Sequence, residues 1–376
     1  KMKFDRNTLL GFGLMAVLLI GYIAVTNKQQ TEYNRKKNER LAAEKATQDS
    51  LAKLQKPKQD SAQQKQDSIA TVNRVHLFKG AEDTTEKTTV VESDLLRVTF
   101  TNKGGQVKMV ELKKFKGPDS NYVKLGASSF NKFSYPVNTG QSGPNGTIET
   151  GNEYFSTGEL KKNADGSQSI SFSLKGADSA ATSGIVHTFT VKKDDYMIDF
   201  AVQLHGVNQL VTGGALNVNW QYEAVRQEQD LSYEKQQTQV SYVTDGSFDY
   251  HTISRKSHKA FDENVSWVGI RQRFFMAILS AKNKFSSGDW NWTDDSTNTV
   301  VLSTANMKVP VPAGNDFTVP FGLYYGPSDY HILTKYDQKF GTAVNLGQGI
   351  YSFVRPINKF LIIPIFDFLK GIAGSM

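Results

Sequence analysis

The pattern of hydrophobic and polar positions divides the chain into four stretches. Residues 1–27 contain an uncharged, largely apolar run, and residues 28–74 are polar almost throughout. Short alternating runs separated by turn residues fill 75–350, and residues 351–376 are rich in apolar side chains again. These patterns predict a membrane anchor, a polar linker, a β-rich domain and a terminal amphipathic helix, in that order.

The apolar run Leu9–Val25 is seventeen residues long, which is just enough for a helix to cross a bilayer core of about 30 Å. A cleaved signal peptide is the alternative. Its apolar region would be about 7–15 residues long and would end in a small-x-small site, which only Ala24-Val25-Thr26 approximates. We therefore favour an uncleaved anchor. Its lipid-facing side chains are predicted to be Leu9, Leu10, Phe12, Leu14, Leu18, Leu19, Ile20 and Ile23.

The net charge of +7 lies entirely in residues 1–74, because basic and acidic residues are equal in number from Val75 onward. A nucleic-acid-binding domain would carry its basic surface on the fold itself. The excess instead lies beside the predicted anchor, where it suits anionic lipid headgroups. The linker 28–74 has no aromatic residue after Tyr33 and too few apolar side chains to offset its chain entropy. We expect a tether there.

Short alternating segments in 75–350 predict many antiparallel strands. Leu96–Phe100 and Val107–Leu112 flank Asn102-Lys103-Gly104-Gly105 and form a predicted hairpin. Further strands are predicted at 169–174, 186–191, 197–204, 216–222, 240–243, 248–253 and 299–302. No βαβ period occurs, which argues against a parallel nucleotide-binding sheet. The fold class predicted is mainly β, an antiparallel sandwich.

Two helices are predicted towards the end of the chain. The first begins after a cap at Ser328 and places Tyr330, Leu333, Tyr336 and Phe340 on one face. The second, within Phe353–Ile372, is too short and too charged to span a membrane, and it is predicted to lie in the membrane interface with a kink at Pro364. A helix buried against the sandwich is the alternative.

The interfacial helix is predicted from its two faces at 100° per residue. Its polar half holds Arg355, Asn358, Lys359, Asp367 and Lys370, interrupted by Ile362, Ile363 and Phe366. Its apolar half holds Ile357, Phe360, Leu361, Ile365, Phe368 and Leu369.

The sequence contains no spacing of cysteine, histidine or acidic residues that is typical of a catalytic or metal site. The chain has no cysteine, and its six histidines lack a metal-ligand spacing. Asp194-Asp195 and Asp294-Asp295 lie in predicted turns, where such pairs usually cap the backbone. Trp267–Phe275 is predicted to be a strand buried on one face rather than a base-stacking surface. We predict no catalytic residue, no metal and no cofactor, and hence no enzyme.

Four short motifs, in one order along the whole chain, resemble the YidC family of membrane protein insertases, in its Bacteroidetes form. These motifs are Phe4-Asp5-Arg6-Asn7-Thr8-Leu9-Leu10-Gly11-Phe12, then Ser266-Trp267-Val268-Gly269-Ile270-Arg271-Gln272-Arg273-Phe274-Phe275, then Leu323-Tyr324-Tyr325-Gly326-Pro327, and Leu346-Gly347 followed by 350–369. The resemblance implies a cytoplasmic N-terminus and a large periplasmic β super-sandwich similar to galactose mutarotase. The last motif leads, in the family, to an interfacial helix.

The resemblance also implies the function expected for the parent protein. It would insert and help fold inner-membrane proteins, alone or with the Sec translocon, without nucleotide. Its partners would be the lipid bilayer, nascent membrane proteins and translocon components, with no nucleic acid. The family continues into five further transmembrane helices whose groove contains a buried Arg. The present sequence ends at Met376, before that region, so no groove residue is assigned to it.

Two rival functions remain open from the sequence. A membrane-anchored sugar-binding or mutarotase-like protein would share the fold, and it would need a Glu and a His in one cleft, for example among His187, His205 and Glu223. A structural tether in the cell envelope would share the architecture but would have no client protein.

Overall fold

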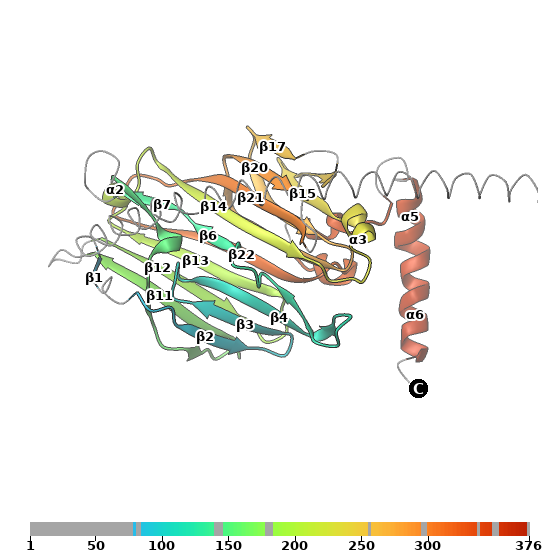
Figure 1. Ribbon diagram of the computed structural model, residues 1–376. Helices are drawn as coiled ribbons and strands as arrows, with labels where there is room; N and C mark the ends of the chain where they lie inside the picture. The colour runs from blue at the N-terminus through green and yellow to red at the C-terminus, as the bar shows by residue number, and fades with distance from the viewer. Residues whose placement is uncertain are drawn as a thin grey trace, which may run out of the picture. The chain divides into compact units, whose positions relative to one another are not determined.

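The computed structural model describes residues 78–79, 84–138, 146–176, 183–254, 257–294, 299–336, 339–347 and 353–373. They belong to one compact unit, 70–376 (Figure 1). The predicted anchor 1–27 and linker 28–74 lie outside the described residues.

The largest sheet has eleven strands. Along its main path the order is β1 (Phe78–Lys79), β11 (Gln168–Gly176), β12 (Gly184–Val191), β13 (Met197–His205), β22 (Asp316–Pro327), β19 (Phe275–Phe285), β18 (Val265–Arg271), β15 (Gln239–Thr244) and β16 (Ser247–Thr252). Two short strands, β9 (Ser156–Thr157) and β10 (Lys161–Lys162), also pair with β11.

Three smaller sheets complete the strand inventory of the described residues. One follows the order β17 (His258–Phe261), β20 (Ser287–Thr293), β21 (Thr299–Pro310), β14 (Ala215–Val225) and β6 (Lys132–Ser134). Another consists of β2 (Thr88–Glu92), β3 (Leu96–Thr101), β4 (Gln106–Lys116) and β5 (Tyr122–Leu125), and β7 (Pro136–Asn138) pairs with β8 (Thr147–Glu149). The strand pairs are antiparallel throughout, which confirms the predicted fold class.

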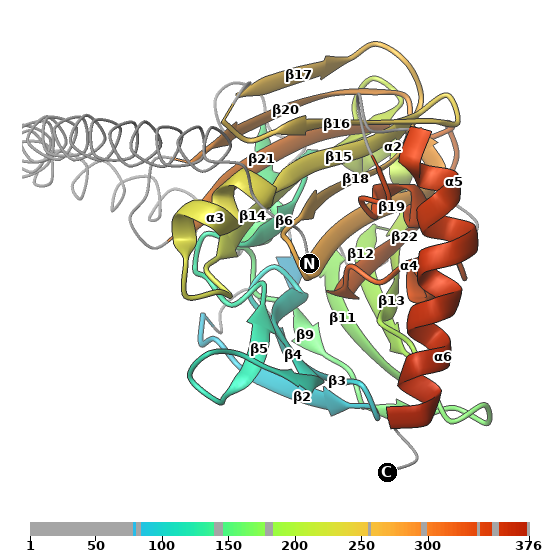
Figure 2. The same cartoon turned by 90° about the vertical axis from the view of Figure 1, so that its right-hand side faces the viewer.

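The two medium-sized sheets pack on the same face of the large one, as Figure 2 shows. The ring of Phe133 in β6 lies 4.9 Å from that of Phe200 in β13 and 5.4 Å from that of Phe321 in β22, centroid to centroid. In the four-stranded sheet, the ring of Phe100 lies 4.9 Å from that of Phe189 in β12. Burying each such side chain contributes about 1.5–3 kcal/mol. Aromatic contacts between the layers therefore hold the sandwich together.

The predicted hairpins form with the expected turns. β3 and β4 are joined by Asn102 to Gly105, in which Gly104 and Gly105 have φ values of 76° and 52° that favour glycine. The turn between β12 and β13 contains Asp195, whose Oδ1 accepts a hydrogen bond from the Met197 amide at 2.9 Å. Asp195 thus caps the backbone, as predicted for this pair of aspartates. Asp295 lies outside the described residues.

The predicted helix after Ser328 is much shorter than the sequence suggests. Helix α4 covers only Tyr330–Leu333, and its cap is Asp329, whose Oδ1 accepts from the Ile332 amide at 3.0 Å. Lys339 has a φ of 61°, which interrupts helical geometry. A separate 3-10 helix, η2 (Phe340–Ala343), follows.

The stretch Trp267–Phe275 is not one strand buried on one face, and this prediction was wrong in two respects. Strand β18 ends at Arg271, because Gln272 turns its amide to the Phe275 carbonyl at 2.9 Å, and β19 then begins at Phe275. The residues Trp267 to Arg271 are all buried, so both faces of β18 are covered.

Two further helices connect strands. Helix α2 (Val207–Leu210) follows β13, and α3 (Leu231–Gln237) follows β14.

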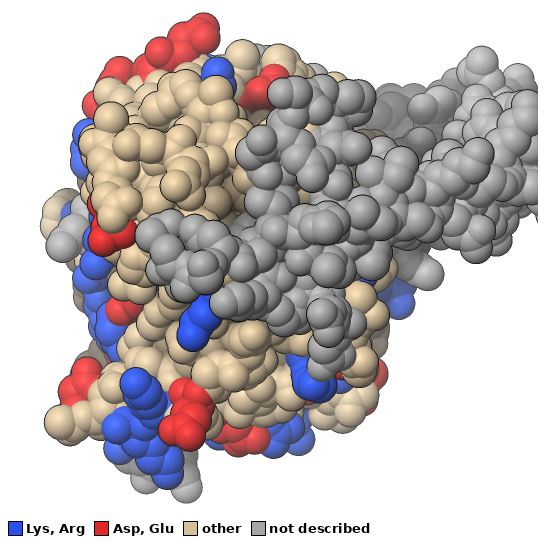
Figure 3. Space-filling view, turned by 90° about the vertical axis from the view of Figure 1, so that its left-hand side faces the viewer, with Lys and Arg blue, Asp and Glu red and all other residues tan. Residues whose placement is uncertain are grey.

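On the face shown in Figure 3, the visible basic and acidic side chains are interspersed. This distribution agrees with the balanced charge of the sequence after residue 75.

Candidate membrane-facing site

The last described segment is helical, and its apolar side chains are exposed. It consists of α5 (Arg355–Ile357), the π-helical turn η4 (Asn358–Ile362) and α6 (Ile363–Ala373). The π turn lies directly before Pro364, where the sequence predicted a kink. Proline has no amide hydrogen for the carbonyl of Phe360, and a π turn is one way for a helix to adjust to this loss.

None of the six side chains predicted for the apolar face is buried. Their exposed fractions are 50% for Ile357, 74% for Phe360, 55% for Leu361, 46% for Ile365, 69% for Phe368 and 52% for Leu369. Soluble proteins rarely leave so many neighbouring large apolar side chains exposed without a partner surface. The arrangement differs from the alternative of a helix buried against the sandwich.

Three more apolar side chains join this exposed surface. Phe353 is 72% exposed, Phe366 68% and Ile362 38%. The helical wheel placed Ile362 and Phe366 on the polar side, and Phe353 was not assigned to a face. Their apolar character was the signal available in the sequence, but on a straight helix Ile362 and Phe366 do not share a face with Phe360.

Two polar contacts join this helical segment to the β domain. The Asn358 side-chain amide donates to the Leu346 carbonyl at 3.0 Å, and His331 Nε2 lies 3.1 Å from Asp367 Oδ2. In the part of the chain that the structure describes, no helix combines the length and hydropathy needed to cross a bilayer.

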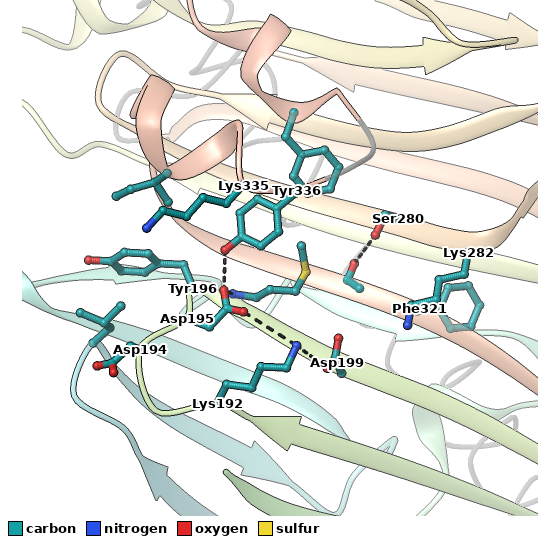
Figure 4. Close-up of a pocket in the computed structure, with 15 residues that line it drawn as sticks. Lys192, Asp194, Asp195, Tyr196, Asp199, Ser280, Lys282, Phe321, Lys335 and Tyr336 are labelled. Carbon is teal, nitrogen blue, oxygen red and sulfur yellow. Dashed lines mark hydrogen bonds and ion pairs between the residues drawn. The ribbon is translucent and has the colours of Figure 1, made fainter. Parts of the chain in front are cut away.

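A pocket of about 620 Å³ lies close to α4, beside the turn between β12 and β13 (Figure 4). It is lined by Leu95, Lys192, Asp194, Asp195, Tyr196, Met197, Asp199, Ser280, Lys282, Phe321, Gly322, Ile332, Lys335, Tyr336 and Phe340. The lining therefore mixes aromatic rings with both signs of charge.

The charged groups at the centre of this pocket are satisfied by one another. Lys192 Nζ lies 2.8 Å from Asp199 Oδ2 and 3.8 Å from Asp195 Oδ2. Burial opposes the charge of Lys192, but the hydrogen bond to Asp199 and the nearby carboxylates raise its pKa overall. The Tyr336 hydroxyl donates to Asp195 (Figure 4), and burial raises the pKa of Tyr336 above its usual value. These contacts therefore fix the positions of Lys192, Asp195, Asp199 and Tyr336 in the pocket.

The residues proposed for a mutarotase-like cleft do not share one site. His187 is fully buried, with Nδ1 2.7 Å from the Gly105 carbonyl and Nε2 2.6 Å from the Tyr135 hydroxyl. His205 contacts Asp316 at 3.0 Å on the surface, and Glu223 accepts hydrogen bonds from Ser128 and Thr299. None of the three lines the pocket of Figure 4.

Burial lowers the pKa of His187 to about 4. The neutral ring must donate from Nδ1 to the Gly105 carbonyl, so Nε2 accepts from Tyr135. Both ring nitrogens are thus used in holding the core together. Among the described residues, no group of three His, Asp or Glu side chains is arranged to hold a metal ion.

Comparisons with known proteins agree on one family. A family model described as the YidC periplasmic domain matches residues 88–362. The membrane protein insertase YidC of Phocaeicola vulgatus is 26% identical over 392 residues, covering 99% of this chain and 59% of that protein. The same protein of Bacteroides fragilis is 25% identical, with the same coverage. The chain thus spans about 59% of the length of these relatives.

Solved structures with a similar fold are distant in sequence. A galactose mutarotase related enzyme from Lactobacillus acidophilus has 9% identity and a TM-score of 0.39, with 64% of this chain and 97% of that one covered. A galactose mutarotase-like protein from Lactobacillus casei has 8% identity and a TM-score of 0.41, with 64% and 100% covered. These values are too low to carry an argument about activity.

Proposed function

The chain belongs to the YidC periplasmic domain family, and on this premise we propose that it is the anchor and periplasmic part of a membrane protein insertase. The parent protein inserts nascent inner-membrane proteins and helps them fold, alone or together with the Sec translocon. It acts without cofactor or chemical catalysis. Residues 1–27 hold the chain in the inner membrane with a cytoplasmic N-terminus, and the β domain lies in the periplasm.

The observation that supports this proposal best is the exposed apolar surface of α5–η4–α6. A helix with large apolar side chains and flanking charges lies stably at the boundary between headgroups and acyl chains. Phe360 and Phe368 are the most exposed of the six predicted apolar residues. We propose that they enter the outer leaflet of the inner membrane and fix the position of the β domain above it.

The immersion of this helix is tested in the reconstituted chain, without relying on insertase activity. The protein has no cysteine, so a Leu361→Cys variant accepts a single environment-sensitive fluorophore. We expect blue-shifted emission and strong quenching by nitroxide lipids, as for a probe in the acyl region. A Leu160→Cys variant carries the matched control, because Leu160 is 40% exposed on the β domain. Equal, water-like emission from both positions would refute immersion.

Function is tested in the parent protein with Phe360→Asp and Phe368→Asp combined. Each acidic group opposes immersion in the interface, so insertion of client proteins should fall severalfold. The control combines Tyr122→Asp with Leu160→Asp, which replaces two exposed apolar side chains of the β domain. Normal insertion by the helix variant would remove the proposed coupling.

A further inference from the structure

A second cavity, unrelated to the membrane-facing helix, lies between β4 and β6. Its volume is about 390 Å³. Four parts of the chain line it: the residues before β2, the β3–β4 region, the segment that leads into β6, and the 3-10 helix η1 (Thr150–Asn152). The lining side chains that the argument uses are Glu86, Lys103, Lys108, Asn131, Lys132 and Asn152. We call this cavity the β4–β6 pocket.

The carboxylate in the β4–β6 pocket is already satisfied. Glu86 Oε1 accepts hydrogen bonds from Lys108 Nζ at 2.6 Å and from the Thr101 hydroxyl at 2.8 Å. The bonds from Lys108 and Thr101 lower the pKa of Glu86, so it stays ionised at neutral pH. Glu86 and Lys108 therefore neutralise each other.

Two lysines of the pocket have no carboxylate of their own. Lys132 Nζ donates to the neutral Asn152 Oδ1 at 2.7 Å, and Lys103 Nζ lies 5.9 Å from the centre of the Tyr154 ring. Within the described ranges, no carboxylate forms an ion pair with either ammonium. Burial and the charge of Lys103 lower the pKa of Lys132, although Glu149 opposes this shift. The two ammonium groups therefore make the pocket cationic.

A buried amide adds an unused donor. Asn131 Oδ1 accepts from the Glu223 amide at 2.6 Å, which fixes the orientation of the side chain. Its Nδ2 is buried and has no hydrogen-bond partner among the described residues. A buried donor left without an acceptor costs about 1–3 kcal/mol. A ligand with several acceptor oxygens and negative charge would suit the two lysines, and Asn131 lines the same pocket.

We propose that the β4–β6 pocket binds a phosphate group, with Lys103 and Lys132 supplying the charge and Asn131 a hydrogen bond. A phosphate offers acceptor oxygens in several directions and binds lysine well as a point charge. The volume is near the lower end of ligand pockets, about 300–1,000 Å³, which suits a free phosphate or a lipid headgroup. The function proposed above does not involve this pocket.

The proposal is tested by calorimetry on the whole chain in an uncharged, phosphate-free detergent, with inorganic phosphate as the probe. We expect one site on the unmodified chain and at least about tenfold weaker binding for Lys103→Met combined with Lys132→Met. The control is Lys161→Met with Lys162→Met, which removes two exposed lysines from β10. Equal binding by the pocket variant and the control variant would overturn the proposal.

Asn131→Asp provides a variant that keeps the acceptor for Glu223 but replaces the free amide by a negative charge. It should abolish phosphate binding, and because the new carboxylate is buried it should also lower the thermal unfolding midpoint, so binding is measured at a temperature at which circular dichroism shows the variant to be folded. Binding at unchanged affinity would exclude Asn131 from the site and overturn the assignment.

The source of the phosphate group is identified by a second titration with short-chain phosphatidylglycerol below its micellar concentration. Tighter binding than inorganic phosphate, again lost in the lysine variant, would indicate a lipid headgroup. Binding of inorganic phosphate alone would indicate a soluble anion. The absence of binding in both titrations would refute the pocket as a phosphate site.

Discussion

The imidazole of His331 in α4 lies 3.1 Å from the carboxylate of Asp367 in α6, measured from Nε2 to Oδ2. Helix α4 directly follows β22, a central strand of the large sheet. Ile332, which also belongs to α4, lines the pocket of Figure 4. This side-chain contact thus links the helical segment α5–η4–α6 to the β domain, in addition to the hydrogen bond from Asn358 to Leu346.

Removing this contact should increase the mobility of the helix without destabilising the domain. His331 and Asp367 are both about half exposed, and exposed ion pairs contribute about 0–1 kcal/mol. We expect Asp367→Ala to leave the thermal midpoint unchanged and to increase the mobility of a nitroxide on Phe360→Cys, measured by electron paramagnetic resonance. Glu263→Ala, which removes the surface pair with Lys259, is the control. Identical spectra with and without Asp367 would show that the contact does not restrain the helix.

A buried carboxylate gives Gln272 a structural role. Gln272 Nε2 donates to Glu234 Oε1 at 2.7 Å and to the Val225 carbonyl at 2.9 Å. The Glu234 side chain also accepts from the amides of Gln227 and Glu228. This network holds the end of β14, the middle of α3 and the β18–β19 turn together.

Gln272→Ala should therefore lower the free energy of unfolding by about 1–3 kcal/mol, since it deprives the buried Glu234 of a partner. Urea denaturation measures the change. Gln229→Ala, at an exposed glutamine of the neighbouring loop, should stay within about 0.5 kcal/mol of the unmodified chain. Equal stability of the two variants would contradict the importance of the network.

The example of Gln272 shows what the sequence could and could not predict. Alternation at 169–174 and 197–204 predicts strands well, because one face of each strand is buried. The motif containing Gln272 carried the family resemblance, but its partner Glu234 lies 38 residues away and on another element. The pattern of hydrophobic and polar residues within one segment contains no information on such a contact.

The wrong length predicted for the helix after Ser328 also results from contacts that a local sequence pattern does not contain. Tyr330, Leu333, Tyr336 and Phe340 have helical spacing, yet the helix that Asp329 caps already ends at Leu333, and Lys339, with a φ of 61°, separates it from the 3-10 helix of Phe340. The aromatic rings of Tyr336 and Phe340 still meet that of Tyr324 in the core, at centroid distances of 5.6 and 6.3 Å. Tertiary packing, rather than helical periodicity, thus explains why these positions are apolar.

The buried His187 predicts a pH-dependent loss of stability. Its pKa is about 4 in the folded protein, against an ordinary value of 6.5. The unfolded chain therefore binds more protons between these values, and stability falls as the pH decreases from about 6.5 to 4. At 1.36 kcal/mol per unit, the loss from this group is about 3 kcal/mol.

Replacing His187 with glutamine should remove this contribution. Because glutamine does not titrate, we expect His187→Gln to be less stable than the unmodified chain at pH 7 but to show a shallower decline towards pH 4. Urea denaturation at several pH values measures both slopes. His205→Gln, at an exposed histidine, is the control and should follow the unmodified chain. Parallel curves for His187→Gln and the unmodified chain would rule out this effect.

The exposed Phe366 leads to a prediction about which side of the helix faces the membrane. The helical wheel placed Phe366 on the polar side, yet it is 68% exposed, close to 69% for Phe368. Large exposed apolar side chains favour the boundary between headgroups and acyl chains. We therefore expect Phe366 to be immersed as well as Phe360.

A cysteine scan in the reconstituted chain tests this orientation. A fluorophore on Phe366→Cys should be quenched by nitroxide lipids about as strongly as one on Phe360→Cys, whereas one on Lys359→Cys should remain in water. If Phe366→Cys instead behaves like Lys359→Cys, the membrane face is the one predicted for a straight helix.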